Sequence, residues 1–308
     1  MKKCSRYRLL AILIVLTLHS CTAPTLEVLQ TTSLSHYPSA SALVGTKEGM
    51  YILGDDARQV LFVDGNHNLK DSIRLFDGQG RFDKDEKPDF ESAFLFDTDG
   101  NHYIVALGSF ATANRCRVGW INLDTRKLEK LDTVSLPQTG IAAVNIEGST
   151  IIGKTLVLGN RANHSYPTNH LLLIDWGGKT NLQYSVIKTI KLTFPKSVPV
   201  IGLSDIYYDA QRDWLLFTAS TENTMNAYSD GAIGDSYVGY IKTISSKLGQ
   251  QAITPDRFLN LKTYLSPDQA YKIEGITMEG KEAGELLLHL SADNDNGQST
   301  LFKLRWKL

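Results

Sequence analysis

The sequence contains few prolines, few cysteines and no excess of charge of either sign. Its 308 residues include 9 Pro and 3 Cys, and 32 Lys and Arg stand against 33 Asp and Glu. With 42% hydrophobic residues, this composition excludes disordered and collagen-like chains. A formal net charge of -1 offers no basic surface to a nucleic acid, so we expect no nucleic-acid partner. Length alone allows either one large all-β domain or two smaller domains.

The first twenty residues have the pattern of an export signal. Four basic side chains precede an apolar run from Leu9 to Leu18. At about ten residues this run is too short to cross a bilayer, since crossing takes roughly 20 residues. The run ends in Leu18-His19-Ser20-Cys21, which resembles the lipobox of bacterial lipoproteins. The resemblance implies that a signal peptide, residues 1–20, is removed and that Cys21 carries a lipid anchor. A buried apolar strand or helix is the alternative, but it leaves the basic residues unexplained.

We therefore expect the mature chain, residues 21–308, in the bacterial cell envelope, with its lipid in the outer membrane and its domain facing the periplasm. Loss of Cys4 with the leader and lipidation of Cys21 leave Cys116 alone, so no intrachain disulfide forms and a hydrophobic core must stabilise the fold. The seven His form no His-x-x-x-His pair and there is no Cys-x-x-Cys, so a zinc site of the usual spacing is absent.

Beyond the leader, apolar residues alternate with a period of two. Examples are Met50–Leu53, Val60–Val63 and Leu286–Leu290. No stretch keeps a helical period over three turns. Many short strands separated by turn signals predict an all-β sandwich, barrel or propeller.

A repeat favours the propeller. Five times, a small or acidic residue opens a strand, a polar turn follows, and a stronger apolar strand ends in small and polar residues. The openings at positions 41, 91, 147, 205 and 274 lie 50, 56, 58 and 69 residues apart, which is typical of four-stranded blades with loop insertions. We predict one domain of five blades. A six-bladed ring is the alternative, because the last interval is long enough to contain a degenerate extra blade.

The strand count also predicts how the ring closes. The last repeat contains three strands and ends at Ser299–Trp306, whereas one further strand, Leu26–Ser33, precedes the first repeat. If this N-terminal strand pairs at the outer edge of the last blade, both chain ends close the ring and the exposed edge is covered.

The five openings suggest a metal site. The first strand of each propeller blade lines the central channel, so these residues should meet in one ring although they are far apart in sequence. Clustered carboxylates repel one another unless they are protonated or neutralised. Ca²⁺, which takes six to eight oxygen ligands, is the cation we expect, although another divalent cation would serve. The alternative is that these residues are solvated or accept hydrogen bonds from backbone amides. The predicted ligands are Ser41, Glu91, Glu147, Asp205 and Glu274.

Polar residues that follow the inner strands are candidates for contact with a substrate or ligand around such a metal. Arginine suits a phosphate or carboxylate, because its planar fork binds two oxygens at once. The alternative is that these are ordinary turn residues, which Asp and Asn favour for conformational reasons. The predicted substrate-binding residues are Asp55, Asp56, Arg58, Asn160, Arg161, Asp293 and Asp295, and Glu222 and Asn223 occupy a similar place.

Short motifs carry a resemblance to known propellers over nearly all of the mature chain. They are Tyr51–Asp56, Lys87–Glu91, Asn145–Gly148, Leu158–Arg161, Tyr228–Gly231, Lys272–Gly275 and Asp293–Asp295. On these motifs the sequence resembles an uncharacterised family of bacterial lipoprotein-type propellers, which implies a fold and little chemistry. More distantly, the order Ser, Glu, Glu, Ser/Asp, Glu is similar to the central calcium site of the calcium-activated nucleotidases (apyrases), and Lys272–Gly275 resembles a strand opening of phytase-like propellers. The departure is in blade four, where Ser204 and Asp205 compete for the ligand position.

The sequence is compatible with three functions, and the fold alone does not distinguish them. The first is an anchored binding or scaffold module with a cation in its channel and an unidentified small-molecule or protein ligand. The second is a calcium-dependent hydrolase of phosphoesters or phosphoanhydrides. The third is a glycosidase that uses paired channel carboxylates. No Gly-x-Ser-x-Gly elbow is present. We favour the first function, in a monomer.

Overall fold

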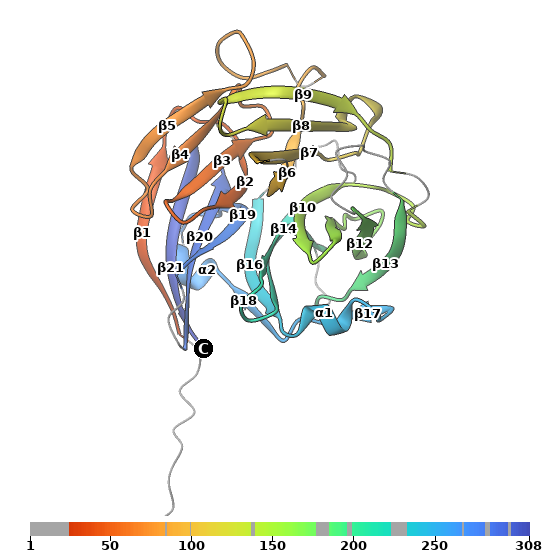
Figure 1. Cartoon of the computed structure of the whole chain (residues 1–308). Coiled ribbons are helices and arrows are strands. Elements are labelled where there is room, and N and C mark those ends of the chain that lie inside the picture. Colours follow the sequence, from red (N-terminus) through yellow and green to blue (C-terminus); the bar gives the residue numbers. More distant parts are fainter. Residues whose placement is uncertain are drawn as a thin grey trace, which may run out of the picture.

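The computed structural model describes residues 25–83, 85–98, 100–136, 139–176, 185–195, 199–222, 233–266, 268–280, 284–294 and 297–308. Their strands form five sheets arranged around one axis, a five-bladed β-propeller (Figure 1). The predicted all-β propeller is confirmed. The predicted signal peptide and Cys21 lie outside the described residues. No helix within the described ranges is long and apolar enough to span a membrane.

The core of each blade is four antiparallel strands, ordered from the channel outward. Blade one contains β2 (Ala40–Gly45), β3 (Met50–Gly54), β4 (Gln59–Val63) and β5 (Leu69–Arg74). Blade two contains β6 (Phe90–Thr98), β7 (Asn101–Gly108), β8 (Arg117–Asn122) and β9 (Lys127–Thr133). Blade three contains β10 (Ile146–Ile152), β11 (Thr155–Asn160), β12 (Asn169–Asp175) and β13 (Val186–Leu192). Blade four contains β14 (Ile201–Asp209), β15 (Trp214–Glu222), β16 (Ile233–Ile241) and β18 (Arg257–Asn260).

Blade five combines the two ends of the chain. It contains β19 (Lys272–Glu279), β20 (Glu285–Asp293), β21 (Ser299–Lys307) and, at its outer edge, β1 (Leu26–Leu34). The register of β1 against β21 runs from Leu26 opposite Trp306 to Leu34 opposite Ser299. The predicted closure of the ring by the N-terminal strand is therefore confirmed.

The long interval before blade five contains connecting elements. Besides strands of blade four, its described residues form the short helices α1 (Ile244–Lys247) and α2 (Lys262–Leu265) and the strand β17 (Ala252–Ile253). β17 pairs in parallel with β13, so that it adds a fifth strand to the edge of blade three. A 3-10 turn, Ala113–Arg115, connects β7 and β8. The five-bladed interpretation holds, and the six-bladed alternative is wrong.

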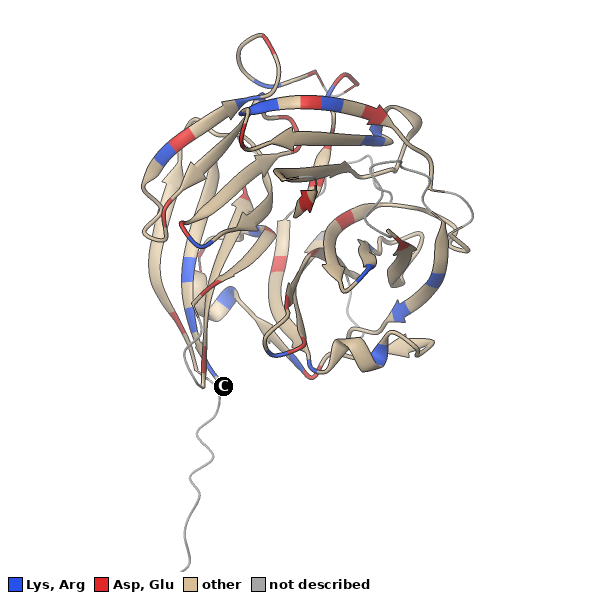
Figure 2. Ribbon diagram, in the orientation of Figure 1, with Lys and Arg blue, Asp and Glu red and all other residues tan. Residues whose placement is uncertain are grey.

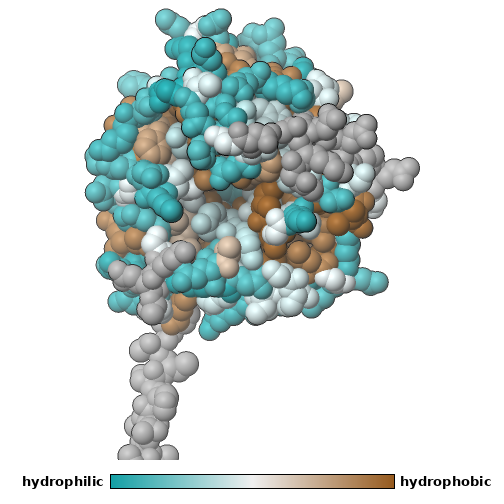
Figure 3. All heavy atoms as spheres, viewed as in Figure 1, coloured by the Kyte–Doolittle hydropathy of each residue, from teal (hydrophilic) through white to brown (hydrophobic). Residues whose placement is uncertain are grey.

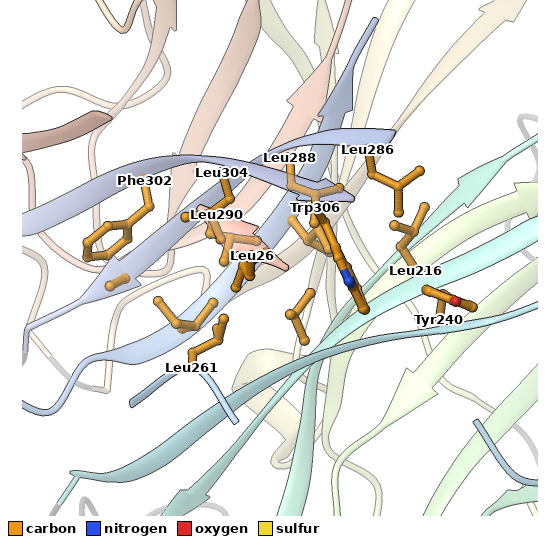
Figure 4. Packing of buried hydrophobic residues seen from close by; sticks show 14 residues of the cluster. Leu26, Leu216, Tyr240, Leu261, Leu286, Leu288, Leu290, Phe302, Leu304 and Trp306 are labelled. Carbon is orange, nitrogen blue, oxygen red and sulfur yellow. The ribbon is translucent and has the colours of Figure 1, made fainter. Parts of the chain in front are cut away.

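Hydrophobic side chains fill the spaces between neighbouring blades. Trp120 of blade two stacks on Trp176, beside β12 of blade three, with ring centroids 6.0 Å apart. Between blades four and five, Leu216 and Tyr240 pack with Trp306 and Leu26 (Figure 4). The alternating pattern of the sequence thus buries one row of side chains of each strand against the next blade. The surface in Figure 3 is largely hydrophilic, with a hydrophobic area over blade three.

The innermost strands position the candidate site. β2, β6, β10, β14 and β19 are neighbours around the ring. Gly148 lies against the backbone at Asp205, and Gly275 lies against Leu43, so residues at equivalent positions of neighbouring blades are adjacent. Side chains on the first residues of the five strands therefore gather at one end of the channel. We call this end the channel mouth.

Candidate functional site

A β-bulge occurs near the start of every innermost strand. In each blade the register between the first and second strands shifts around a single residue. A bulge re-aims its side chain, so the same feature directs five side chains at the channel mouth. We call these residues the bulge ring: Ser41, Glu91, Glu147, Ser204 and Glu274.

Blade four differs from the sequence prediction by one position. The bulge of β14 lies between Leu203 and Asp205, so Ser204 and not Asp205 is equivalent to the three glutamates. Asp205 is buried, and its two carboxylate oxygens accept hydrogen bonds from the backbone N–H groups of Ile206, at 2.7 Å, and Ile276, at 2.9 Å. Asp205 thereby joins blades four and five through backbone amides, as the alternative interpretation of a channel carboxylate proposed.

A second set of equivalent residues surrounds the bulge ring. In each blade, the first-strand residue just before the bulge pairs with a residue of the second strand. The residue that follows this partner in the sequence belongs to the second set. Three of them, Asp55, Arg161 and Asp293, belong to the predicted substrate-binding set. We call this set the rim: Asp55, Ser109, Arg161, Ser220 and Asp293.

The other predicted substrate-binding residues have structural contacts or lie elsewhere. The guanidinium of Arg58 lies 3.8 Å from the ring centre of Phe82 and donates to the carbonyl oxygen of Asp77 at 2.6 Å. Asp56 accepts a hydrogen bond from Arg81. The side-chain oxygen of Asn160 accepts from the N–H of Asn145 at 2.7 Å. Asp295, Asn223 and the side chain of Glu222 lie outside the described residues.

Three carboxylates come together between blades one and two. One oxygen from each of Asp55, Asp89 and Glu91 lies within 4.8 Å of the other two. The ammonium of Lys87 forms ion pairs with Asp55 and, at 2.9 Å, with Asp89. Among the described residues no second group of three His, Cys, Asp or Glu meets this distance, so the three bulge glutamates do not approach one another as closely.

Asp89, which is fully buried, was not among the site residues predicted from the sequence. Besides Lys87, its carboxylate contacts Arg115, at 3.3 Å, and accepts a hydrogen bond from the Ser109 hydroxyl. Asp89 has a left-handed backbone with φ 58°, and Ser39, two residues before the bulge of blade one, has φ 50°. A repeat of Pro, then two residues, then the bulge residue, at Pro38 and Pro88, could have revealed this position.

Glu91 of the bulge ring is half-buried. No hydrogen bond joins its carboxylate to the rest of the described structure. Burial raises the pKa of Glu91 well above its usual range, and the charges of Asp89, Asp55 and Glu147 raise it further. The ammonium of Lys87 opposes this shift. The channel mouth therefore contains a carboxylate that accepts no hydrogen bond from the described residues and whose charged form the ammonium of Lys87 stabilises.

Burial and neighbouring negative charges also raise the pKa values of two other acids at the mouth, Glu274 and Asp205. Burial raises the pKa of Glu274 to about 7, although Lys272 forms an ion pair with it at 2.8 Å. Burial likewise raises the pKa of Asp205, and the charges of Glu147 and Glu274 add to this effect. One oxygen of Glu147 accepts a hydrogen bond from the amide of Asn145. Acidic residues accordingly lie on the strands around the channel, among them β6 and β10 (Figure 2).

Arg161 occupies the opposite side of the mouth. This buried guanidinium donates to the hydroxyl of Ser204 at 2.8 Å, to that of Ser220 at 2.9 Å and to the carbonyl oxygen of Leu203 at 3.2 Å. It thus extends from the rim of blade three to the bulge and rim of blade four. Acidic residues of the mouth lie in every blade, and the buried guanidinium of Arg161 with the hydroxyls of Ser204 and Ser220 lies between blades three and four.

These features define a five-bladed propeller with a bulge ring and, beside it, an acidic cluster of Asp55, Asp89 and Glu91 at one end of its channel. The chain belongs to a family of unknown function, DUF6929, whose family model matches residues 36–306. The predicted membership of an uncharacterised family is confirmed. No curated protein matches the chain.

Solved structures share the fold at low identity. Glutaminyl cyclase from Myxococcus xanthus is 10% identical with a TM-score of 0.52, and the match covers 92% of this chain and 96% of that chain. A Bacteroides ovatus xyloglucan-locus protein, GH43B, is 12% identical with a TM-score of 0.51, and the match covers 89% of this chain and 54% of that chain. At these identities the likeness shows a common architecture and does not assign an activity.

Proposed function

We propose that this protein is an envelope-anchored binding propeller whose channel mouth holds a divalent cation, with Ca²⁺ as the best match. The observation that carries the proposal is the meeting of Asp55, Asp89 and Glu91 within 4.8 Å. Carboxylate oxygens at this spacing suit a hard cation that takes several oxygen ligands. The absence of a hydrogen-bond donor to Glu91 among the described residues supports the same proposal.

Electrostatics gives the cation a stabilising role. The raised pKa values of Glu91, Asp205 and Glu274 mean that ionising these groups costs free energy in the folded protein. A bound cation would offset that cost, because it stabilises the charged form of every nearby carboxylate. Ser41, Glu147 and Glu274 belong to the same bulge ring, so we propose that they complete the ligand shell directly or through water. Asp205 would attract the ion by its negative charge without binding it, because both of its carboxylate oxygens already accept hydrogen bonds from backbone amides.

Lys87 identifies the position a cation would take. Its ammonium lies against Asp55 and Asp89, two members of the three-carboxylate group, and is itself mostly buried. A protein cation held there shows that the position favours positive charge. An entering divalent ion would displace the ammonium, whose flexible stem allows it to move away. Lys87 would then neutralise the site whenever the ion is absent.

The test is calcium-dependent stability of the chain without its leader. A cation that binds only the folded state, at 100 times its Kd, stabilises by about 2.7 kcal/mol. We therefore expect Ca²⁺ to raise the Tm by several degrees and chelation to reverse the shift, as followed by circular dichroism. Glu91→Gln should abolish the response. Glu48→Gln, an exposed position in the turn after β2, serves as the matched control and should respond like wild type.

Two results would count against the proposal. An unchanged melting curve with Ca²⁺ and with chelator would mean that Lys87 and protonation alone neutralise the mouth. An equal response of Glu91→Gln and wild type would place the ion elsewhere. Calcium-dependent hydrolysis of a phosphoanhydride by the same sample would instead favour the hydrolase alternative, since a metal can polarise an oxygen and orient water.

Strand β1 starts at the end of the propeller opposite the channel mouth, on the side where the proposed lipid anchor would lie. Lys272 at the mouth pairs with Asp293, which pairs with Ser299, so β21 begins at the mouth and Trp306 lies at the far end. Leu26 pairs with Trp306 and therefore also lies at the far end. A lipid on Cys21 would hold that end near the membrane and leave the channel mouth facing away from it. We propose this orientation for a protein at the outer membrane, in the periplasm.

Fractionation tests the anchor. Cys21→Ala should move the protein from the membrane fraction of its host to the soluble fraction, because a covalent lipid supplies the affinity for the bilayer. Cys116→Ala is the matched control, since Cys116 lies partly buried in the propeller, and this variant should stay with the membrane. Membrane association of Cys21→Ala at the wild-type level would refute lipidation at Cys21.

A further inference from the structure

Two histidines meet at the seam between the first and the last blade, away from the channel mouth. His67 lies in the turn between β4 and β5 of blade one, and His289 lies in β20 of blade five. Nε2 of His67 is 2.9 Å from Nδ1 of His289. The side chains are buried, with 4% and 2% of each residue exposed. Buried imidazoles in direct contact need a defined protonation state.

Hydrogen bonds extend from both ends of this pair. Nδ1 of His67 is 3.1 Å from the hydroxyl of Thr32 in β1, and Nε2 of His289 is 3.0 Å from Oε2 of Glu279 at the end of β19. Lys303 of β21 lies 2.7 Å from the same Glu279 oxygen and donates to the carbonyl oxygen of Gly65 at 2.7 Å. One network therefore connects the closing strand β1, the turn of blade one and three strands of blade five.

Neutral imidazoles satisfy this network completely. The Glu279 carboxylate accepts only, so Nε2 of His289 carries its hydrogen and Nδ1 of His289 is an acceptor. Nε2 of His67 then donates to it, and Nδ1 of His67 accepts from the Thr32 hydroxyl. From Thr32 to Glu279, each hydrogen-bond donor of the network thus points to the acceptor of the next residue. This assignment of the hydrogens follows from the hydrogen-bond partners.

We propose that the network from Thr32 through His67 and His289 to Glu279 is an acid-sensitive latch that holds the N-terminal strand and the first blade against the last blade. The latch closes a ring that is joined only by noncovalent contacts, between β1 and β21 and across this seam. Acid would release it locally, since the described residues of the other blade junctions include no pair of histidines in contact.

The pair accepts one extra proton but not two. Protonated His289 can donate to Nε2 of His67 if His67 moves its hydrogen to Nδ1 and donates to Thr32. A second proton sets two N–H groups and two positive charges against each other. Burial, then the charges of His289 and Lys303, lower the pKa of His67 to about 4, and burial lowers that of His289. Asp64 and Glu279 oppose the shift of His67, and Lys47 and Glu48 line a small cavity beside His289.

These pKa values determine whether acid favours the open or the closed latch. Once the latch opens, His67 regains its ordinary pKa near 6.5, so the open form binds more protons than the closed form between about pH 6.5 and pH 4. Opening should then become about tenfold more favourable for each pH unit in that window. Between pH 6 and pH 4.5 we expect a roughly twentyfold increase in the opening of β1, because the slope is below its maximum near both pKa values.

Amide hydrogen exchange of β1 measures this opening directly, after correction for the intrinsic pH dependence of exchange. Strand β8 of blade two, which has no contact with the latch, is the internal reference. His67→Gln keeps a donor toward His289 but cannot titrate, so its increase should fall to within about threefold. His36→Gln, an exposed histidine before β2, is the matched control and should keep the wild-type increase. NMR of labelled histidine side chains should show His67 neutral down to about pH 4.

A second variant tests the latch without altering a titrating group. A Cβ at Gly65 would lie 2.5 Å from Oε1 of Glu279, so Gly65→Ala must displace that carboxylate. We expect β1 in Gly65→Ala to open more readily at pH 7, with little further change on acidification. Opening of β1 that does not depend on pH, or that rises equally in wild type and His67→Gln, would overturn the proposal. Wild-type protection of β1 in Gly65→Ala at pH 7 would also overturn it.

Discussion

A chain that lacks residues 26–34 is expected to lose its cooperative thermal unfolding transition. The deletion removes β1 and leaves the whole length of β21 as an unpaired edge. It also removes Leu26 from the cluster around Trp306 (Figure 4). A domain of this kind is stable by about 5–15 kcal/mol in total, and the loss of one strand with its buried side chains removes most of that.

Circular dichroism and size-exclusion chromatography are the measurements for this deletion. We expect an aggregated or partly unfolded chain with no sharp transition. A synthetic peptide of residues 26–34, added in trans, should restore a transition, whereas a peptide of the same composition in scrambled order should not. An unchanged Tm after the deletion would show that β1 contributes little to ring closure.

The second large effect is a dependence of stability on pH that the channel mouth imposes. The pKa of Glu274 is about 7 in the folded protein, against an ordinary value of 4.5. Between these values the folded state binds more protons than the unfolded state, so stability falls as pH rises from about 4.5 to about 7. The full cost above pH 7 is about 3 kcal/mol for this group alone. The raised pKa values of Glu91 and Asp205 act in the same direction.

Glu274→Gln isolates this contribution. The neutral amide cannot ionise, so urea unfolding at pH 5 and pH 8 should differ less in this variant than in wild type, by about 3 kcal/mol. The favourable ion pair with Lys272 acts only on the charged form of Glu274 and already contributes to its pKa of about 7, so the difference between the two pH values reports the net cost of ionisation. Glu48→Gln should keep the wild-type difference. Equal pH dependence in wild type and Glu274→Gln would show that Glu274 ionises without cost.

Calcium should reduce this pH effect if it binds at the mouth. The ion interacts with charged carboxylates, so its stabilisation should be larger at pH 8 than at pH 5. The histidine latch has the opposite sign, because acid opens it. The two effects are separable, since one is measured globally in variants of Glu274 and the other locally in β1.

Sequence periodicity by itself determined the architecture. Alternating apolar residues predicted strands, and the repeat of about fifty residues predicted five blades, because each blade must bury the same two faces. The closing strand was predictable too, since a blade that ends after three strands leaves an edge that Leu26–Leu34 can cover. The sequence also predicted that Glu91, Glu147 and Glu274 occupy equivalent positions, and the bulges confirm it.

Only the tertiary structure decided which polar residues meet. Ser204 and Asp205 both follow Leu203, and the register of β14 alone places Ser204 in the bulge and turns Asp205 toward the amides of blade five. Asp89 and Lys87 precede their strand and lie outside the repeat of strand openings, yet Asp89 belongs to the group of three carboxylates and Lys87 forms an ion pair with it. His67 and His289 are 222 positions apart and share no motif. Such contacts depend on loop conformation and on the packing of one blade against another, and a period along the chain contains no information about either.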